Sequence, residues 1–296
     1  MKAFLTRSKR LDNVAPGLCR ALSSAISCAR RPGHGDRPHQ GGCDDDLHPT
    51  TFSRSRIRRR GRVVDGSFAS YSTLEAAWNY RYPWGSDHNG SARMYGSASD
   101  HNHVYLASSG VLELKAAHIT WDEGKSSASP YLPIHYHSGA VHAKTQVLVN
   151  DQFPNWEVKG EFQAPSARGT WPAFWLTGAN TWPPESDILE YKGDARNWFN
   201  TYRNASGGWS NTIVGVSNPG SWHGYRAWIT KVNATDVDIH YYLDGTWVGQ
   251  HRGAGFVGQP MWIIINLQME GSSGSPGPTT DTYYRARNLY VGRTRV

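Results

Sequence analysis

The sequence predicts an all-β sandwich preceded by a disordered basic tail, and three observations support this fold class. Beyond residue 65, short runs with the composition of β-strands recur between turn signals, without helical stretches. All 13 Trp residues lie in this region, which is also dense in Tyr and Gly. Cys19, Cys28 and Cys43 all precede it, so no disulfide framework supports the sandwich.

The charges divide the chain at the same point. Residues 1–64 hold 14 of the 31 Lys and Arg and 5 of the 24 Asp and Glu, a net charge of +9, whereas residues 65–296 carry a net charge of −2. The overall charge of +7 therefore describes the tail, and the body has no basic surplus that would favour nucleic acid. We expect one folded domain over residues 65–296, a length that a single β-sandwich can reach.

Residues 1–64 alternate short apolar stretches with Arg-rich runs and show no sustained period, which predicts disorder. They lack the uninterrupted apolar segment of a secretory signal, so this stretch is a transit peptide, an authentic tail or a mis-assigned start of the reading frame, and we favour the last. No apolar stretch is long enough for a membrane span, and no membrane partner is expected.

Six segments of the body have the composition of strands, and one local motif predicts a hairpin. Asp244-Gly245 lies between two alternating runs, as expected for a two-residue turn. The run 261–267 is apolar apart from Asn266, which is typical of a strand buried on both sides or lying under a covered groove. The predicted strands are 111–115, 145–149, 155–162, 187–191, 236–243 and 261–267.

Three glycosylation sequons, at Asn89, Asn204 and Asn233, also lie in the body. Together they favour an exported, extracellular glycoprotein.

The most informative segment is ESDILE at residues 185–190, which holds three carboxylates on one predicted strand. On a regular strand Glu185 and Asp187 share a face, and Glu190 points to the opposite one. A β-bulge after Asp187, absorbed by the apolar pair Ile188 and Leu189, would return Glu190 to the shared face. The two glutamates could then approach to the roughly 5–5.5 Å carboxyl separation of a retaining glycosidase.

Three carboxylates this close cannot all ionise freely, so at least one pKa must rise, and Asp187 between the glutamates could hold the proton. The alternative is a strand whose acidic residues face solvent. Aromatic residues on both sides of the segment, Trp182 before it and Tyr191 after it, favour a binding cleft instead. Trp171 and Trp175 lie just upstream and could stack on sugar rings, although one of them could equally belong to the core.

The segment 185–190 resembles the bulged E-x-D-x-x-E signature of glycoside hydrolase family 16, and residues 171–175, WPAFW, resemble the segment that precedes it there. Weaker matches occur in the family's order, at 138–141 before this segment and at 242–245 and 263–267 after it. The resemblance therefore covers roughly residues 65–296. It implies a concanavalin A-like β-jelly-roll with a concave cleft. The implied activity is retaining, endo-acting hydrolysis of a β-linked glucan or galactan.

The resemblance also assigns roles. It implies Glu185 as nucleophile, Glu190 as acid/base and Asp187 as the assisting carboxylate, with tryptophans as sugar platforms. Ser186 and Pro184 depart from the usual aliphatic residue and Gly, which argues against the best-known laminarinase subgroup. The implied platforms are Trp171, Trp175 and Trp182.

Other candidate sites are weaker. The pairs at 101–103 and 135–137, each His-x-His, lack a third ligand at convincing spacing, so no metal site is predicted. The family's calcium site stays open, because Tyr284-Arg285-Ala286-Arg287 stands where an acidic residue is common. Lys192 and Arg196 could meet an acidic polysaccharide, or belong to an ordinary loop, and Glu270 is a possible substrate contact.

We therefore expect a monomeric enzyme without cofactor whose partner is a polysaccharide. Two alternatives remain: a non-catalytic lectin-like sandwich, and a transglycosylase that uses the same residues.

Overall fold

The structure is a computed structural model that describes residues 60–204 and 206–295. The three cysteines and most of the predicted tail lie outside the described residues. The described chain is almost entirely β-structure, as predicted. Its elements are β1 (Arg60–Asp65), α1 (Tyr71–Ala77), β2 (Trp78–Tyr80), β3 (Ala92–Tyr95), β4 (Val104–Ser108), β5 (Val111–His118), β6 (Tyr136–Ala143), β7 (Asn155–Gln163), β8 (Thr170–Gly178), β9 (Glu185–Glu190), β10 (Arg196–Tyr202), β11 (Trp209–Gly215), β12 (His223–Lys231), β13 (Val237–Leu243), β14 (Thr246–Gly253), β15 (Met261–Met269), the 3₁₀ turn η1 (Gly271–Ser273) and β16 (Thr282–Thr294).

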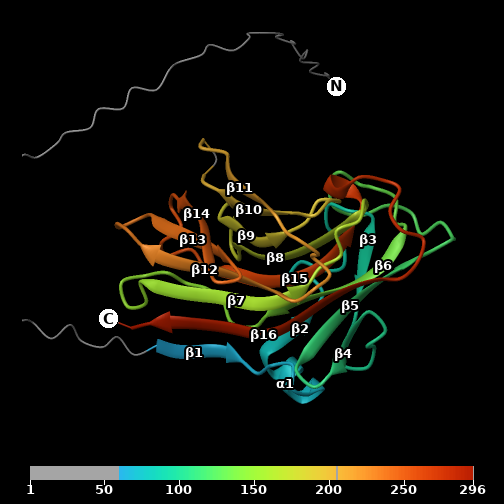
Figure 1. The fold of residues 1–296 in the computed structure, drawn as a ribbon, viewed down its shortest axis with the longest axis horizontal. Helices are drawn as coiled ribbons and strands as arrows, with labels where there is room; N and C mark the ends of the chain where they lie inside the picture. The colour runs from blue at the N-terminus through green and yellow to red at the C-terminus, as the bar shows by residue number, and fades with distance from the viewer. Residues whose placement is uncertain (1–59, 205, 296) are drawn as a thin grey trace, which may run out of the picture. The chain divides into compact units, whose positions relative to one another are not determined.

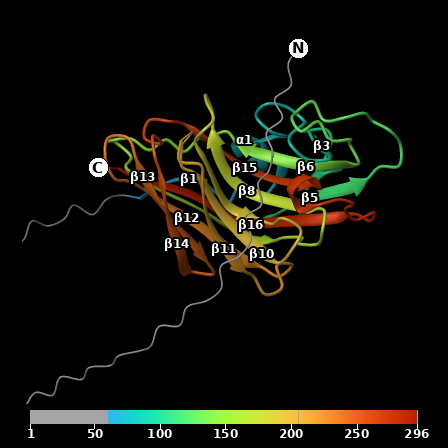
Figure 2. The same cartoon turned by 90° about the horizontal axis from the view of Figure 1, so that it is seen from above.

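The strands form two layers (Figure 1). One layer has the order β11-β10-β9-β8-β15-β6, and the other has the order β5-β16-β7-β12-β13-β14, with β5 and β6 paired where the layers join. Figure 2 shows β8 and β15 of the first layer running side by side. Aromatic side chains from both layers meet between them, for example Phe162 of β7 and Phe174 of β8, whose ring centroids are 4.8 Å apart. This arrangement confirms the predicted β-jelly-roll sandwich.

Most of the predicted strands are confirmed, because β5, β7, β9, β13 and β15 cover five of the six predicted runs. The predicted hairpin is also present, with Leu243 paired to Thr246 across the turn. Asp244 and Gly245 have φ values of 49° and 79°, the left-handed conformation that a type I′ turn requires at both positions.

Two local predictions were wrong. Residues 145–149 form no strand; Val147 makes a single bridge to Met261, while Val147 and Val149 are fully buried. The apolar alternation there reports burial and not ladder pairing. In addition, the short helix α1 was not expected, although Ser70 and Thr73 form a reciprocal capping box at its start.

The first described strand begins before residue 65. Residues 60–64, which the charge pattern assigned to the tail, belong to β1, which pairs with β16. Within the described part of the chain, none of the helices has the length and apolar character that a membrane span requires.

Strand β9 contains the bulge that the carboxylate spacing predicted. Asp187 pairs with Trp175 of β8 and Leu189 pairs with Phe174, so Ile188 has no partner on β8. An extra residue in one strand shifts the alternation of side chains by one position. The side chain of Glu190, which follows the bulge, therefore lies on the same face of β9 as Glu185 and Asp187.

Asn197 of β10 satisfies the backbone groups at this bulge. Its side-chain oxygen accepts a hydrogen bond from the Glu190 N–H at 2.9 Å, and its amide donates to the Ile188 carbonyl at 3.3 Å. Asn197 is fully buried, so no water replaces these contacts at its side chain. The register of β9 therefore depends on one neighbouring side chain.

Replacing Asn197 with Leu should destabilise the protein by about 2–4 kcal/mol, because two buried backbone groups lose their partner. Urea unfolding measures this change. The matched control is Asn79→Leu, since the Asn79 amide bonds a side chain, His142, at 3.1 Å and not a bulge. Equal midpoints for Asn197→Leu and the parent protein would contradict the role of Asn197.

Candidate active site

All three predicted carboxylates lie together on the floor of a cleft. Glu185, Asp187 and Glu190 line the same cavity of about 330 Å³, while Ile188 and Leu189 are fully buried on the other side of the strand. The predicted arrangement is therefore present. It arises because the bulge places the apolar pair in the core and returns Glu190 to the cleft.

Each glutamate accepts a hydrogen bond from a different tryptophan. The Trp182 indole N–H donates to Glu185 Oε2 at 2.6 Å, and the Trp171 indole N–H donates to Glu190 Oε1 at 2.7 Å. These neutral donors fix the two carboxyl groups separately at opposite ends of the strand. Tryptophans that the sequence analysis considered only as sugar platforms thus also orient the carboxylates.

Asn200 is a site residue that the sequence analysis missed. Its amide nitrogen donates to Asp187 Oδ2 at 2.9 Å and to Glu190 Oε2 at 2.6 Å, and its oxygen accepts from the Asn211 amide at 2.6 Å. The Asn211 contact fixes which way the Asn200 amide points. Asn200 lies directly opposite Asp187 in the β9–β10 ladder, so a correct pairing of β9 with β10 would have identified it.

Lys192 pairs with the Glu190 carboxylate and does not extend freely from a loop. Its ammonium lies 3.1 Å from Glu190 Oε2 and 4.7 Å from the centre of the Trp198 ring. Arg196, the other cation considered for an acidic substrate, is exposed and paired with Asp194. Neither side chain is an unpaired cation facing the cleft.

Ser186, where the family usually has an aliphatic residue, points to the opposite side of β9. Its hydroxyl lies 2.7 Å from the Tyr241 hydroxyl, which also donates to the Asn200 carbonyl at 2.9 Å and lies 2.6 Å from Thr201 Oγ1. A buried hydroxyl needs such partners. Ser186 therefore belongs to a polar network behind the site and removes no group from the cleft.

The protonation of the carboxylates is strongly perturbed. Burial raises the pKa of Glu185 to about 7, and the nearby Glu190 carboxylate adds to the rise, while the Trp182 N–H opposes it. Burial and the charges of Glu190 and Glu185 raise the pKa of Asp187 well above its ordinary value. Glu185 and Asp187 therefore hold protons more tightly than exposed carboxyl groups do, so an acid and a base can coexist in one site.

The tryptophans divide into buried and exposed ones. Trp171 and Trp175 are only 8% and 6% exposed, so they offer little ring surface, whereas Trp182 is 54% exposed. The sequence analysis did not single out Trp84 and Trp209, which are 47% and 43% exposed. With Trp182 they line a groove of about 950 Å³ at the Glu185 end of the site.

The cavities along β8 and β9 share lining residues and form one cleft with two ends. The groove at the Glu185 end shares Trp175 and Glu185 with the central cavity, and a pocket at the other end shares Trp171 with it. Asn89 lines every one of these cavities and was not predicted as a cleft residue. A cleft that continues on both sides of the carboxylates suits cleavage inside a long chain.

An ion pair holds the wall segment that carries Asn89 in place. Arg93 of β3 bonds Asp87 at 2.9 Å, two residues before Asn89. Next to Asn89, the His88 ring packs on Trp175 with centroids 5.8 Å apart, and burial lowers the pKa of His88 to about 4. His88 is therefore neutral at pH 7 and brings no positive charge into the cleft.

Within residues 60–204 and 206–295, no group of three or more His, Cys, Asp and Glu side chains is arranged to hold a metal ion. His135 and His137 instead pair with carboxylates, Glu270 and Glu123, at 2.7 and 2.5 Å.

Comparisons with known proteins identify relatives of this chain. A scan against models of known protein families finds no match. The chain is 46% identical over 233 residues to a galactan endo-beta-1,3-galactanase of Flammulina velutipes, which covers 78% of this chain and 90% of that protein. It is 31% identical over 117 residues to the endo-1,3-1,4-beta-glycanase ExsH of Rhizobium meliloti, covering 38% of this chain and 24% of that protein.

Solved structures share the fold at lower identity. The chain matches an endo-1,3-beta-glucanase from Streptomyces sioyaensis with a TM-score of 0.62 and 19% identity, over 80% of this chain and 97% of that one. It also matches SCLam, a non-specific endo-beta-1,3(4)-glucanase from family GH16, with a TM-score of 0.58 and 16% identity, over 80% and 92%. At these identities the likeness supports the fold alone.

The raised pKa of Glu185 predicts a pH-dependent stability. A carboxyl group whose folded pKa lies above its unfolded value binds its proton more tightly in the folded state, so its stabilising effect is lost as pH rises through about 7. Between pH 5 and 8 the parent protein should therefore lose stability relative to Glu185→Gln, by on the order of 2 kcal/mol and several degrees in Tm.

Differential scanning calorimetry at both pH values measures this effect. The quantity to compare is the difference between the two proteins, because His88 and His251 have lowered pKa values and add stability as pH rises. Parallel Tm profiles for the parent protein and Glu185→Gln would refute the raised pKa.

Proposed function

The chain belongs to glycoside hydrolase family 16 and is an endo-acting, retaining hydrolase of a β-linked polysaccharide, and we propose that this polysaccharide is a β-1,3-linked galactan. The proposal is supported by the relative from Flammulina velutipes, whose name specifies that substrate and which is 46% identical to this chain over 233 residues. The exposed groove tryptophans suit a galactan, because pyranose rings present apolar faces that stack on indole.

The observation that carries the catalytic assignment is the bulge in β9. It brings Glu185 and Glu190 to one cleft, each with its own indole N–H donor. Two carboxyl groups on the same face, separately held, are what double displacement requires.

In the proposed mechanism, Glu185 attacks the anomeric carbon as Glu190 donates its proton to the glycosidic oxygen. The carbon–oxygen bond breaks, the leaving chain departs with the proton, and a covalent glycosyl ester forms on Glu185. Glu190, now ionised, then takes a proton from water as the water oxygen attacks the same carbon. The ester bond breaks, and the product keeps its β configuration.

Asp187 and Asn200 organise the protons of this reaction. Asp187 lies between the glutamates, and its raised pKa lets it hold a proton while Glu185 is ionised. The Asn200 amide donates to Asp187 and Glu190 together and so keeps the acid/base aligned with the group. Lys192 offsets the charge of Glu190 once that residue has lost its proton.

The aromatic groove at the Glu185 end would hold the sugar units that become attached to the enzyme. Trp182 packs on Tyr202 at 4.3 Å, and Tyr202 packs on Trp209 at 5.0 Å, which forms a wall of rings along the groove. Trp84 lines the same groove and stacks on Tyr82. In this proposal Trp171 and Trp175 act through their edges and N–H groups more than through their ring faces.

We also propose that the enzyme is secreted. We propose further that it acts as a monomer, because a single chain supplies every carboxylate and both walls of the cleft. The sequon at Asn233 lies on an exposed turn and suits a glycan. Asn89 does not, because a glycan there would stand in the cleft.

Replacing Glu185 with Gln tests the function. Release of reducing ends from β-1,3-galactan should fall by at least about 10³-fold, because the nucleophile is lost while the fold is kept. The matched control is Glu161→Gln, whose side chain pairs with Arg287 on the other sheet and should leave the rate unchanged.

A polysaccharide panel that includes laminarin identifies the substrate. Turnover by Glu185→Gln at the parent rate would exclude this residue as the nucleophile. Binding of galactan by the parent protein without release of reducing ends would indicate the lectin-like alternative, and elongated products would indicate a transglycosylase.

A further inference from the structure

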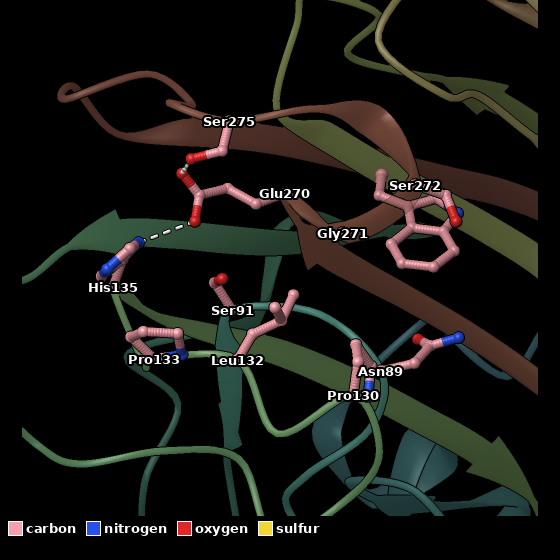
Figure 3. A pocket seen from close by; sticks show the side chains of 11 residues that line it. Asn89, Ser91, Pro130, Leu132, Pro133, His135, Glu270, Gly271, Ser272 and Ser275 are labelled. Carbon is pink, nitrogen blue, oxygen red and sulfur yellow. Dashed lines mark hydrogen bonds and ion pairs between the residues drawn. The ribbon is translucent and has the colours of Figure 1, made fainter. Parts of the chain in front are cut away.

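A pocket of about 480 Å³ extends the cleft beyond Trp171, at the Glu190 end (Figure 3). The turn after β15 forms one wall, with Glu270 and Gly271, and the segment before β6 forms the other, with Leu132 and His135. The volume lies in the range of ordinary ligand pockets. Glu185 does not line this pocket, whereas it lines the groove at the opposite end.

The wall of the pocket is built in a strained conformation. Glu270 has a φ of 55° and a ψ of −135°, a region that residues with a side chain rarely adopt. Gly271 follows with a φ of 56°, and a Cβ there would lie 2.5 Å from the Trp171 ring. Strain of this kind persists only where the surroundings enforce it, and it is frequent at ligand-binding walls.

The surroundings hold the Glu270 carboxyl group tightly. Oε1 accepts hydrogen bonds from the Ser275 hydroxyl at 2.7 Å and the Gly277 N–H at 3.0 Å, and Oε2 lies 2.7 Å from His135 Nδ1. Figure 3 shows this pair at one end of the pocket. Burial alone would raise the pKa of Glu270, but these hydrogen bonds lower it below the ordinary value, so the group is an anion at neutral pH.

The charges along the cleft are one-sided. Among residues 60–204 and 206–295, four carboxyl groups line its cavities, and Lys192, bound to Glu190, is the one Lys or Arg that does so. No Lys or Arg of this described part of the chain lines the pocket at the Glu190 end. A second anion entering this pocket would meet the buried Glu270 carboxylate, which has His135 but no described Lys or Arg beside it, and this encounter is unfavourable.

Resting on the proposed function, we propose that this pocket binds a neutral hexose unit of the leaving chain and that Glu270 excludes units carrying carboxylate or sulfate. The anomeric carbon must lie at Glu185 and the leaving oxygen at Glu190, so a chain laid along the cleft places its leaving part in this pocket. Leu132 and the exposed edge of Trp171 offer apolar contact to a sugar ring. The His135–Glu270 pair makes the pocket a specificity determinant.

The test compares two substrates in kcat/KM: a neutral β-1,3-galacto-oligosaccharide labelled at its reducing end, and the same oligosaccharide sulfated on its reducing-end half. The parent enzyme should prefer the neutral substrate at least tenfold. Glu270→Gln should narrow this preference at least threefold, because its carbonyl can keep the Ser275 and Gly277 contacts while the charge is lost. Glu161→Gln, the charge-matched control, should keep the parent preference.

A second variant keeps the inference testable if Glu270→Gln does not fold. Leu132→Trp fills the pocket without touching the bonds of Glu270, and it should lower kcat/KM for both substrates about tenfold. The control is Val232→Trp, on an exposed site outside the cleft, which should not.

The outcomes separate the two proposals. Failure of the parent enzyme to cleave either oligosaccharide overturns the proposed galactanase function and the pocket assignment with it. Cleavage of both at equal rates overturns the pocket assignment alone. An unchanged preference in folded Glu270→Gln, or a parent rate in Leu132→Trp, does the same.

Discussion

The active site depends on the Asn197 side chain, which bonds the backbone groups that the bulge in β9 leaves without strand partners. The bulge in β9 costs two backbone hydrogen bonds in a buried strand, and the Asn197 amide supplies both a donor and an acceptor at that point. Without such a partner the regular register would be favoured, and Glu190 would face the core. Two glutamates five positions apart line one cavity because a neighbouring strand stabilises the bulge between them, and the proposed mechanism uses both on one sugar.

The same strand carries three carboxyl groups that are held mainly by neutral donors. Indole and amide N–H groups contact Glu185, Asp187 and Glu190, and among the described residues Lys192 is the one cation in direct contact. A neutral donor orients a carboxylate but lowers its pKa less than a positively charged guanidinium would. Burial raises the pKa values of Glu185 and Asp187, and the proposed mechanism uses one protonated and one ionised carboxyl group.

Sequence reasoning succeeded where a local pattern determines the structure. The apolar pair Ile188 and Leu189 between carboxylates predicted the bulge, and Asp244-Gly245 predicted the hairpin, because each pattern is decided within a few residues. Asn200 and Asn89 were missed because their roles come from neighbours distant in sequence, across a ladder or a cleft wall. The run 145–149 has strand composition, yet it lies where only Val147 meets a partner, so composition alone could not reveal its irregular backbone.

The two ends of the cleft differ in a way that matches the order of a double displacement. Exposed rings of Trp84, Trp182 and Trp209 line the Glu185 end, while the Glu190 end has a buried indole, small side chains and a bonded carboxylate. In the proposed mechanism the glycosyl unit stays on Glu185, and the leaving chain must depart before water can take its place beside Glu190. Stronger stacking at the Glu185 end retains the glycosyl unit that stays bound to Glu185 until water attacks. Weaker binding at the Glu190 end lets the other half leave, so the asymmetry favours hydrolysis over return of the leaving chain.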